Sequence, residues 1–432
     1  MDMEQTTVNL RELINENIVK PGNQHIKVPI ERPNGSEFDG HTYLIPLEYL
    51  YYNDQNGRIG SAISEYESEH GELKPGHNEE YNQAIQEMIA NSNSQKMKRL
   101  VDDIGRKGQA LPGYVLNDGR VVDGNRRFTA ERILAGDESV VGKQYFEAVI
   151  LDNLTLNNED DLYQIKQLEL KIQFGQLEKE DYDPIDKAID AYKTIKKKHV
   201  MTNKEYAKYA DMKPIDVEKL VNEAELVVEF LRFIHANEQN YAIAKEMKLD
   251  GPLQDMLVEY KRSIKDSPDK NEILGALFTK IIQLRTDEGE DDFKAAFRPL
   301  VKNVIGKHQQ DDYLEEVADS SDAVEYALQQ DADGKETEVK NASEVFARIK
   351  SDEEAVAALV QTDEASTRAL DKTANEKQKA EPVKLARAAL DKVDAINPDI
   401  VDILPREECE KLTNILRTLE ESISNIQAHA EE

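Results

Sequence analysis

The stretch LPGYVLNDGRVVDGNRRFTAERILAG, residues 111–136, decides the fold that the sequence predicts. An apolar run is followed by the turn residues Asn117, Asp118 and Gly119, a second short apolar run, and Gly124. A turn of this composition between two apolar runs favours a β-hairpin, and the apolar spacing after Asn125 is typical of a helix. The stretch therefore predicts a β-hairpin that leads directly into the N-terminus of a helix.

Two consecutive arginines stand at the start of this predicted helix. The first backbone N–H groups of a helix have no partner within it, and the helix dipole is positive there, so this end attracts phosphate. Arg126 and Arg127 would add charge and bidentate hydrogen bonds. The alternative is that both are surface residues paired with Asp123 and Glu131. Further basic residues lie close by in the sequence, namely Lys96, Lys98, Arg99, Arg106, Lys107 and Arg120.

The rest of the chain predicts a mixed α+β part followed by an all-α region. Residues 1–80 carry short apolar runs, such as HIKVPI and HTYLIPLEYLYY, that are broken by Pro, Gly and Asn, which indicates short strands. A helix is expected from about residue 81 to Gly105 or Gly108, and a strand at YFEAVILD. Further helices are expected at 159–174, 184–198, 203–210 and 214–234. The predicted domains are 1–150, 151–240 and 241–432.

The charge distribution limits what this protein can bind. The chain has 55 Lys and Arg against 86 Asp and Glu, a net charge of −31, which argues against nonspecific coating of nucleic acid. Residues 311–432 hold 31 acidic and 14 basic residues, a net charge of −17. Within them, 311–340 and 363–382 are typical of linkers or exposed helices, and 383–428 predicts a helical hairpin. The acidic region could also bind a protein partner.

Cysteine content and hydropathy suggest a cytoplasmic protein. Cys409 is the only cysteine, which excludes intrachain disulfides and thiolate-rich metal sites. The N-terminal residues are acidic, and no run of 18 apolar residues occurs, so neither a signal peptide nor a membrane span is expected.

The residues around the two arginines resemble the N-terminal domain of the ParB/sulfiredoxin superfamily. In that family a G-x-x-x-P loop, two strands and a turn precede a GERRxRA-type box. The matching pieces are Gly108 with Pro112, and GNRRFTA at 124–130. Upstream, IPLEYLYYNDQNGR resembles the family's opening strand and N-P-x-Q-x-R box, with Arg58 at the terminal arginine. Downstream, DYDPI at 181–185 and the segment 202–227 resemble the ParB helix opening and helix-turn-helix, so that the resemblance covers about residues 40–235.

The resemblance implies a nucleoside triphosphate pocket, for CTP as in ParB or for ATP. The phosphate-binding residues would be Arg58, Gly108, Pro112, Asp123, Gly124, Asn125, Arg126 and Arg127. If the family's Mg²⁺-binding segment is aligned without gaps upstream of Asp181, it falls on residues 175–179, where suitable side chains are missing. If the alignment is shifted, the Mg²⁺ ligands would be Glu169 and Gln173. Asn125 replaces the acidic residue of the box, so hydrolysis is not implied. The sulfiredoxin branch needs a loop cysteine that this chain lacks, so reduction of sulfinic acids is not expected.

The helix-turn-helix resemblance implies DNA binding through Lys204, Lys208, Lys213 and Lys219. Its second helix also carries Asp216, Glu218, Glu223 and Glu225, which we expect to be exposed. Direct readout of the major groove favours Arg, Lys, Asn or Gln near the start of that helix. We therefore expect modest, steeply salt-dependent DNA affinity. The alternative is an ordinary helical hairpin.

Three hypotheses follow from the sequence. The first is a ParB-like nucleoside triphosphate-binding protein associated with DNA, of the kind found in plasmid, phage or mobile-element contexts, which forms a homodimer. The second is a phosphoryl-chemistry enzyme on the same fold: a CTPase-like nucleoside triphosphatase, a DNase or another nuclease, or an ATP-dependent small-molecule kinase. The third is a non-catalytic interaction scaffold.

Overall fold

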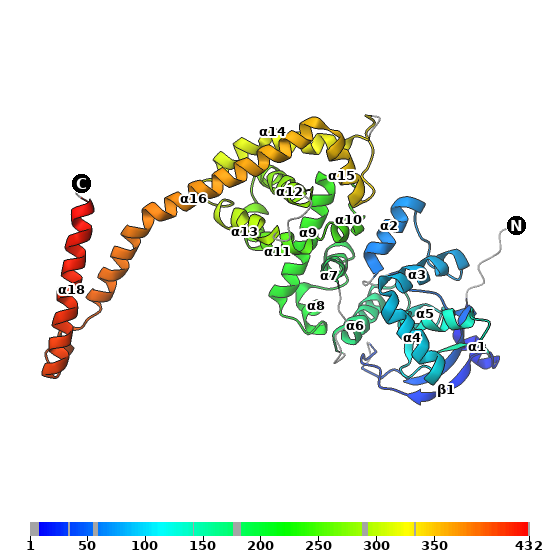
Figure 1. Cartoon of the computed structure of the whole chain (residues 1–432). Helices are drawn as coiled ribbons and strands as arrows, with labels where there is room; N and C mark the ends of the chain where they lie inside the picture. The colour runs from blue at the N-terminus through cyan, green and yellow to red at the C-terminus, as the bar shows by residue number, and fades with distance from the viewer. Residues whose placement is uncertain are drawn as a thin grey trace. The chain divides into compact units, whose positions relative to one another are not determined.

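The computed structural model describes residues 8–32, 35–54, 59–140, 142–175, 183–286, 293–331 and 334–430. The chain divides into two compact units, residues 1–367 and 368–432. The first holds a five-stranded sheet and many helices, and the second is helical (Figure 1). An α+β part followed by a helical remainder is the order that the sequence predicts. Among the described helices, none combines the length and the apolar content needed to cross a membrane.

The sheet has the strand order β1-β2-β5-β3-β4. Strand β3 runs parallel to β5, whereas every other neighbouring pair is antiparallel. The predicted hairpin forms β3 and β4, and Gly119 in its turn has a φ of 89°. The run HTYLIP forms β2, but HIKVPI contributes only His25 to a strand. The strands are β1 (Lys20–His25), β2 (His41–Pro46), β3 (Gly113–Leu116), β4 (Val121–Asp123) and β5 (Tyr145–Leu151).

The two faces of the sheet belong to two separate hydrophobic cores. Along β5, Phe146, Ala148 and Ile150 point into one core, whereas Val149 and Leu151 point into the other, the alternation expected of a strand buried on both sides. The first face is covered by α3 (Glu79–Ser92), α4 (Ser94–Lys107) and α5 (Asn125–Ala135). The second is covered by α6 (Glu159–Gly175) and by apolar side chains from residues 26–40.

The helices beyond the sheet pack around α9, the long helix Pro214–Phe233. Contacts with α7, α8, α11 and α12 bury most of its length. The described part of the chain also holds the helices α1 (Leu10–Asn15), α2 (Gly60–His70), α7 (Pro184–Tyr192), α8 (Asn203–Tyr209), α10 (Ala242–Glu246), α11 (Asp250–Glu259), α12 (Lys270–Thr286), α13 (Phe293–Asn303), α14 (Gln310–Gln329), α15 (Ala342–Ser351), α16 (Glu353–Asp394), α17 (Pro398–Val401) and α18 (Arg406–Ala430). Short helical segments are η1 (Leu47–Tyr49), η3 (Lys193–Lys197) and η4 (Tyr260–Ile264).

The acidic stretch 311–340 is mostly a packed helix rather than a linker or an exposed helix. Tyr313, Val317, Val324 and Leu328 of α14 are all buried, and α14 packs against α12. These residues recur at helical spacing, so that acidic side chains share the helix with an apolar stripe. The expectation for this stretch was wrong because its composition was given more weight than its periodicity.

The second unit consists of the end of α16, then α17 and α18. In Figure 1 the chain reverses direction between α16 and α18. No residue of α18 is buried in this unit.

Candidate functional site

Helix α5 begins directly after strand β4, at Gly124. This glycine has a φ of 100°, and a Cβ atom there would lie 2.8 Å from Cζ of Phe146. Both the backbone conformation and the space therefore require glycine. No side chain caps the first turn of α5, which leaves its backbone N–H groups available to a ligand. The predicted junction of strand and helix is confirmed.

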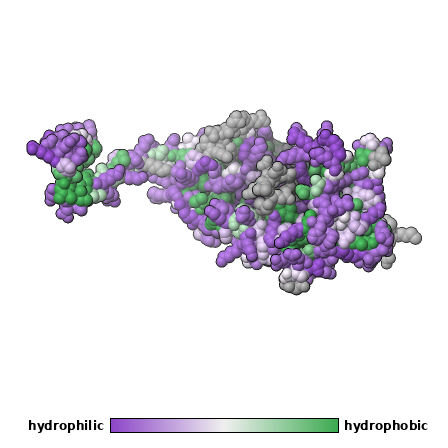
Figure 2. Space-filling model, turned by 90° about the horizontal axis from the view of Figure 1, so that it is seen from below, coloured by the Kyte–Doolittle hydropathy of each residue, from purple (hydrophilic) through white to green (hydrophobic). Residues whose placement is uncertain are grey.

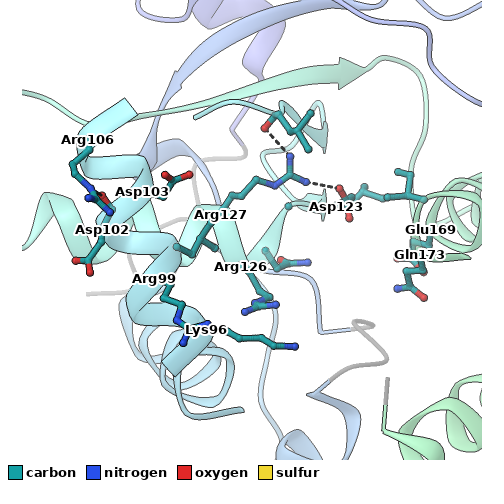
Figure 3. Close-up of a pocket in the computed structure, with 16 residues that line it drawn as sticks. Lys96, Arg99, Asp102, Asp103, Arg106, Asp123, Arg126, Arg127, Glu169 and Gln173 are labelled. Carbon is teal, nitrogen blue, oxygen red and sulfur yellow. Dashed lines mark hydrogen bonds and ion pairs between the residues drawn. The ribbon is translucent and has the colours of Figure 1, made fainter. Parts of the chain in front are cut away.

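A cavity of about 690 Å³ opens at this end of α5. Its walls come from β4, α4, α5 and α6, and they bring together charged residues that are distant in the sequence (Figure 3). The basic lining residues are Lys96, Arg99, Arg106, Arg126 and Arg127, and the acidic ones are Asp102, Asp103, Asp123 and Glu169.

Arg127 makes three hydrogen bonds within the protein. Its Nη1 donates to the carbonyl oxygens of Leu111 (2.6 Å) and Pro112 (2.7 Å), and its Nη2 donates to Oδ2 of Asp123 (2.8 Å). The side chain thereby fastens the loop before β3 to the start of α5. The ion pair with Asp123 matches the alternative considered for this arginine, whereas the described arginines make no ion pair with Glu131. Burial raises the pKa of Glu131 to about 7.

The cations around the cavity are neutralised to different degrees. Arg106 donates from Nε to the backbone oxygen of Asp102, and Asp103 pairs with Lys107 at 2.6 Å. Lys96 and Arg99 are exposed and form no ion pair with any described residue. Figure 3 shows that their charged ends gather near the guanidinium of Arg126. This part of the cavity therefore carries a concentration of positive charge.

The side of the cavity formed by α6 offers oxygen atoms. Glu169 accepts hydrogen bonds from Nδ2 of Asn53 (2.9 Å) and from Nζ of Lys166 (3.4 Å), and burial raises the pKa of its carboxyl group. Oε1 of Gln173 and Oδ1 of Asn125 are buried and accept no hydrogen bond from the described residues. Buried polar atoms normally have partners, so both amide oxygens are suited to a donor or cation of a ligand.

The other residues predicted for the site lie nearby or outside the described residues. Gly108 ends α4 with a φ of 77°, and Pro112 contributes its carbonyl oxygen to Arg127, but neither lines the cavity. Arg58 lies outside the described residues. Lys96 and Arg99, which the sequence places among the basic residues near the motif, line the cavity. Their spacing, together with Arg106, places them on one face of a helix, which was the signal that could have assigned them to the site.

The four lysines predicted to bind DNA are all exposed. Lys204 and Lys208 belong to α8, Lys213 precedes α9, and Lys219 forms an ion pair with Asp216 at 3.0 Å. Burial of their neighbours differs from expectation: Glu223 is only 2% exposed, and Glu225 pairs with Lys265 at 2.5 Å. The expectation that both glutamates face solvent was wrong, because α11 and η4 pack near this part of α9.

A buried chain of polar contacts leads from the cavity to α8. Lys166 bridges Glu169 of the cavity wall to Asp190 of α7, and its Nζ lies 2.6 Å from Oδ1 of Asp190. The hydroxyl of Tyr206, in α8, donates to Oδ2 of the same aspartate at 2.8 Å. The cavity and the first helix of the helix-turn-helix-like pair thus share one hydrogen-bonded network.

No protein-family model matches this chain, and no curated protein matches it either. We therefore interpret the site from its own geometry.

Proposed function

We propose that this chain is a ParB-like protein that binds a nucleoside triphosphate, CTP or ATP, at the N-terminus of α5. The observation that carries the proposal is the uncapped first turn of α5, which opens into a cavity where Lys96, Arg99 and Arg126 converge. Backbone N–H groups and arginine side chains together form the usual receptor for phosphate groups. The volume of about 690 Å³ lies within the range of small-molecule sites.

Mg²⁺ would accompany the triphosphate on the α6 side of the cavity. Glu169, Gln173 and Asn125 offer one carboxylate and two amide oxygens, the atom type that Mg²⁺ prefers. Mg²⁺ generally keeps several waters and binds through few protein groups together with substrate phosphates. Such an ion would offset the repulsion between the triphosphate and Asp123 or Glu169.

DNA is the second ligand in this proposal. Lys204, Lys208 and Lys213 are exposed on α8 and at the start of α9, and their charge supports contacts to phosphates. Asp216 and Glu218 lie on the same helix as Lys219 and oppose them, which supports modest, salt-dependent binding. The chain of contacts through Lys166 offers a physical route by which a nucleotide could alter this surface.

The second unit supports a homodimer. Of the sixteen large apolar side chains exposed on the described part of the chain, ten lie between residues 383 and 426. Figure 2 shows some of them gathered on the terminal helices. Along α18, three of these exposed residues and three half-buried residues together recur at spacings of three and four, the heptad pattern of helices that associate. The members of this heptad stripe are Cys409, Leu412, Leu416, Leu419, Ile423 and Ile426.

A second copy is the partner that suits this stripe. Residues 381–430 hold ten acidic and six basic residues, so their net charge is −4 in a chain of −31. Two copies of this segment would therefore repel each other far less than two copies of the rest of the chain. Ile415 lies beside the stripe and is exposed, so the apolar face of α18 is as wide as that of helices in a bundle.

Calorimetric titration of the full chain with CTP, ATP, GTP and UTP, each with and without Mg²⁺, tests the nucleotide site. We expect one triphosphate to bind with Mg²⁺ and Glu169→Gln to weaken the Mg²⁺ dependence, while Glu138→Gln on the surface serves as the matched control. Product analysis of the same samples reports any hydrolysis. Absence of binding by all four nucleotides would remove this function.

A further inference from the structure

Two histidines face each other across the first two strands of the sheet. His25, the last residue of β1, is the register partner of His41, the first residue of β2, and their ring centroids lie 4.4 Å apart. Asp39 accepts hydrogen bonds at Oδ1 from the backbone N–H of His41 (3.1 Å) and shares a 2.5 Å contact with its Nδ1. One donor atom from each of the three side chains lies within 4.8 Å of the other two.

The backbone, rather than chance side-chain rotation, brings these groups together. The N–H of Ile26 donates to the carbonyl oxygen of Gly40 at 2.9 Å, directly beside the histidine pair. A Cβ atom on residue 40 would lie only 1.7 Å from the carbonyl oxygen of Ile26, so glycine is required for the strands to approach this closely. Directly opposite residues of antiparallel strands hold their Cβ atoms about 4.5 to 5.5 Å apart. The pair is therefore set by the strand register.

The chemistry of the three groups selects a class of ligand. Two imidazoles and one carboxylate suit Zn²⁺ and its neighbours among the transition metals, whereas Mg²⁺ and Ca²⁺ take oxygen atoms. Two nitrogen ligands of a tetrahedral Zn²⁺ lie about 3.3 Å apart, which small rotations of the side chains can reach.

We propose that His25, His41 and Asp39 bind a divalent transition-metal ion, with Zn²⁺ as the best match. All three side chains are exposed, so water completes the coordination shell. The proposal is independent of the nucleotide site, because none of these residues lines that cavity.

The position of the ion indicates its effect. His25 and His41 stand at the two ends of residues 26–40, and Val28, Ile30 and Phe38 from this segment pack in the core on one face of the sheet. An ion held by both histidines would join the two ends of the segment. Binding to the folded form alone raises the stability of that form.

Titration of the full chain with ZnCl₂ tests the site. We expect the wild type to bind Zn²⁺, and His25→Ala and His41→Ala each to weaken this binding by ~10-fold or more. Asp39→Asn tests the carboxylate. The matched control is His308→Ala, which removes an exposed histidine and should leave Zn²⁺ binding unchanged. MgCl₂ should not compete.

Two further measurements test whether the histidines coordinate the ion directly or only form a hydrogen bond with Asp39. Co²⁺ should give visible absorption bands without the intense thiolate band, and His25→Gln should abolish them. ZnCl₂ should raise the unfolding temperature of the wild type but not of His41→Gln, with circular dichroism confirming that both fold. If the histidine variants bind Zn²⁺ as well as the wild type does, or if the wild type does not bind, the proposal is wrong.

Discussion

The guanidinium of Arg127 donates to the carbonyl oxygen of Pro112 across 2.7 Å, and Arg127 and its neighbour Arg126 both line the cavity together with Lys96 and Arg99. The sequence predicts that both arginines bind phosphate. In the structure Arg127 also makes three contacts within the protein. Its replacement should therefore lower stability as well as affect binding.

Replacing each arginine by alanine tests these roles. Arg126→Ala should weaken nucleotide binding roughly ten- to hundredfold, because a charge-assisted contact is lost. Arg127→Ala should lower the free energy of unfolding by about 1 to 3 kcal/mol, because the carbonyl groups of Leu111 and Pro112 lose their donor. Calorimetric titration and urea unfolding measure the two effects. Lys98→Ala, on the same helix as Lys96 but outside the cavity, is the control, and equal behaviour of both arginine variants would contradict the assignment.

Substitution of Gly124 should damage both stability and binding. Gly124→Val places a branched side chain at a φ of 100°, close to Phe146, at a cost of about 1 to 3 kcal/mol or more. Gly136→Ala, at the other end of α5, is the matched control, because its φ is −84° and a Cβ there meets only ordinary contacts. Urea unfolding followed by circular dichroism compares them. Equal stabilities would show that the start of α5 tolerates side chains.

Removal of Lys166 should destabilise the first unit strongly. Lys166→Met leaves Glu169 and Asp190 buried without their shared cation, which typically costs about 3 to 5 kcal/mol. Adding Asp190→Asn should recover part of this loss, because one uncompensated charge disappears. Thermal unfolding of both variants, beside the surface change Lys196→Met, measures the effect. A Lys166 variant as stable as the surface control would show that the network carries little energy.

The stability of the protein should depend on pH through Glu223. Burial raises its pKa to about 7, and its Oε1 has no hydrogen-bond partner among the described residues. The folded form then holds a proton that the unfolded form releases near pH 4.5, so stability falls as the pH rises from about 4.5 to about 7. Glu223→Gln should remove this loss and gain roughly 2 to 3 kcal/mol over the wild type above pH 7.

Urea unfolding of Glu223→Gln and the wild type between pH 4.5 and pH 8 measures this difference. Glu138→Gln at the surface should follow the wild type. A constant difference between Glu223→Gln and the wild type at every pH would contradict a buried titrating group.

The heptad stripe of α18 should hold two copies of the chain together. Leu412→Asp with Leu419→Asp places charges in the centre of the stripe and should convert the dimer to a monomer. Thr418→Asp, outside the stripe, should leave the dimer intact. Light scattering after size-exclusion chromatography measures the molar mass. A wild type that is monomeric at micromolar concentration would contradict the proposal.

The hairpin, the start of α5 and strand β5 could be predicted from the sequence because each depends on a pattern within a few consecutive residues. The turn at 117–119, the glycine before α5 and the apolar run of β5 are each patterns of a few residues, and the structure confirms the hairpin, the start of the helix and the strand that they predict. The helical spacing of α4 could place Lys96 and Arg99 on one face, but it could not place that face against Arg126, because this depends on how α4 packs against α5. The burial of Glu223 was not predictable for the same reason. The helix that packs near it, α11, begins 27 residues further along the chain.

The aromatic ring of Phe146 limits the order in which this site can change during evolution. A Cβ atom on Gly113 would lie 2.4 Å from its Cζ, and one on Gly124 would lie 2.8 Å from the same atom. Neither glycine can acquire a side chain while the ring is present, whereas a smaller residue at 146 would first leave a hole in the sheet core. A smaller residue at 146 would free neither glycine by itself, because a Cβ on residue 113 would still lie 2.7 Å from the carbonyl oxygen of Asp123 and residue 124 would keep a φ of 100°. Residue 146 can therefore change while both glycines stay, but neither glycine can change in response to residue 146 alone.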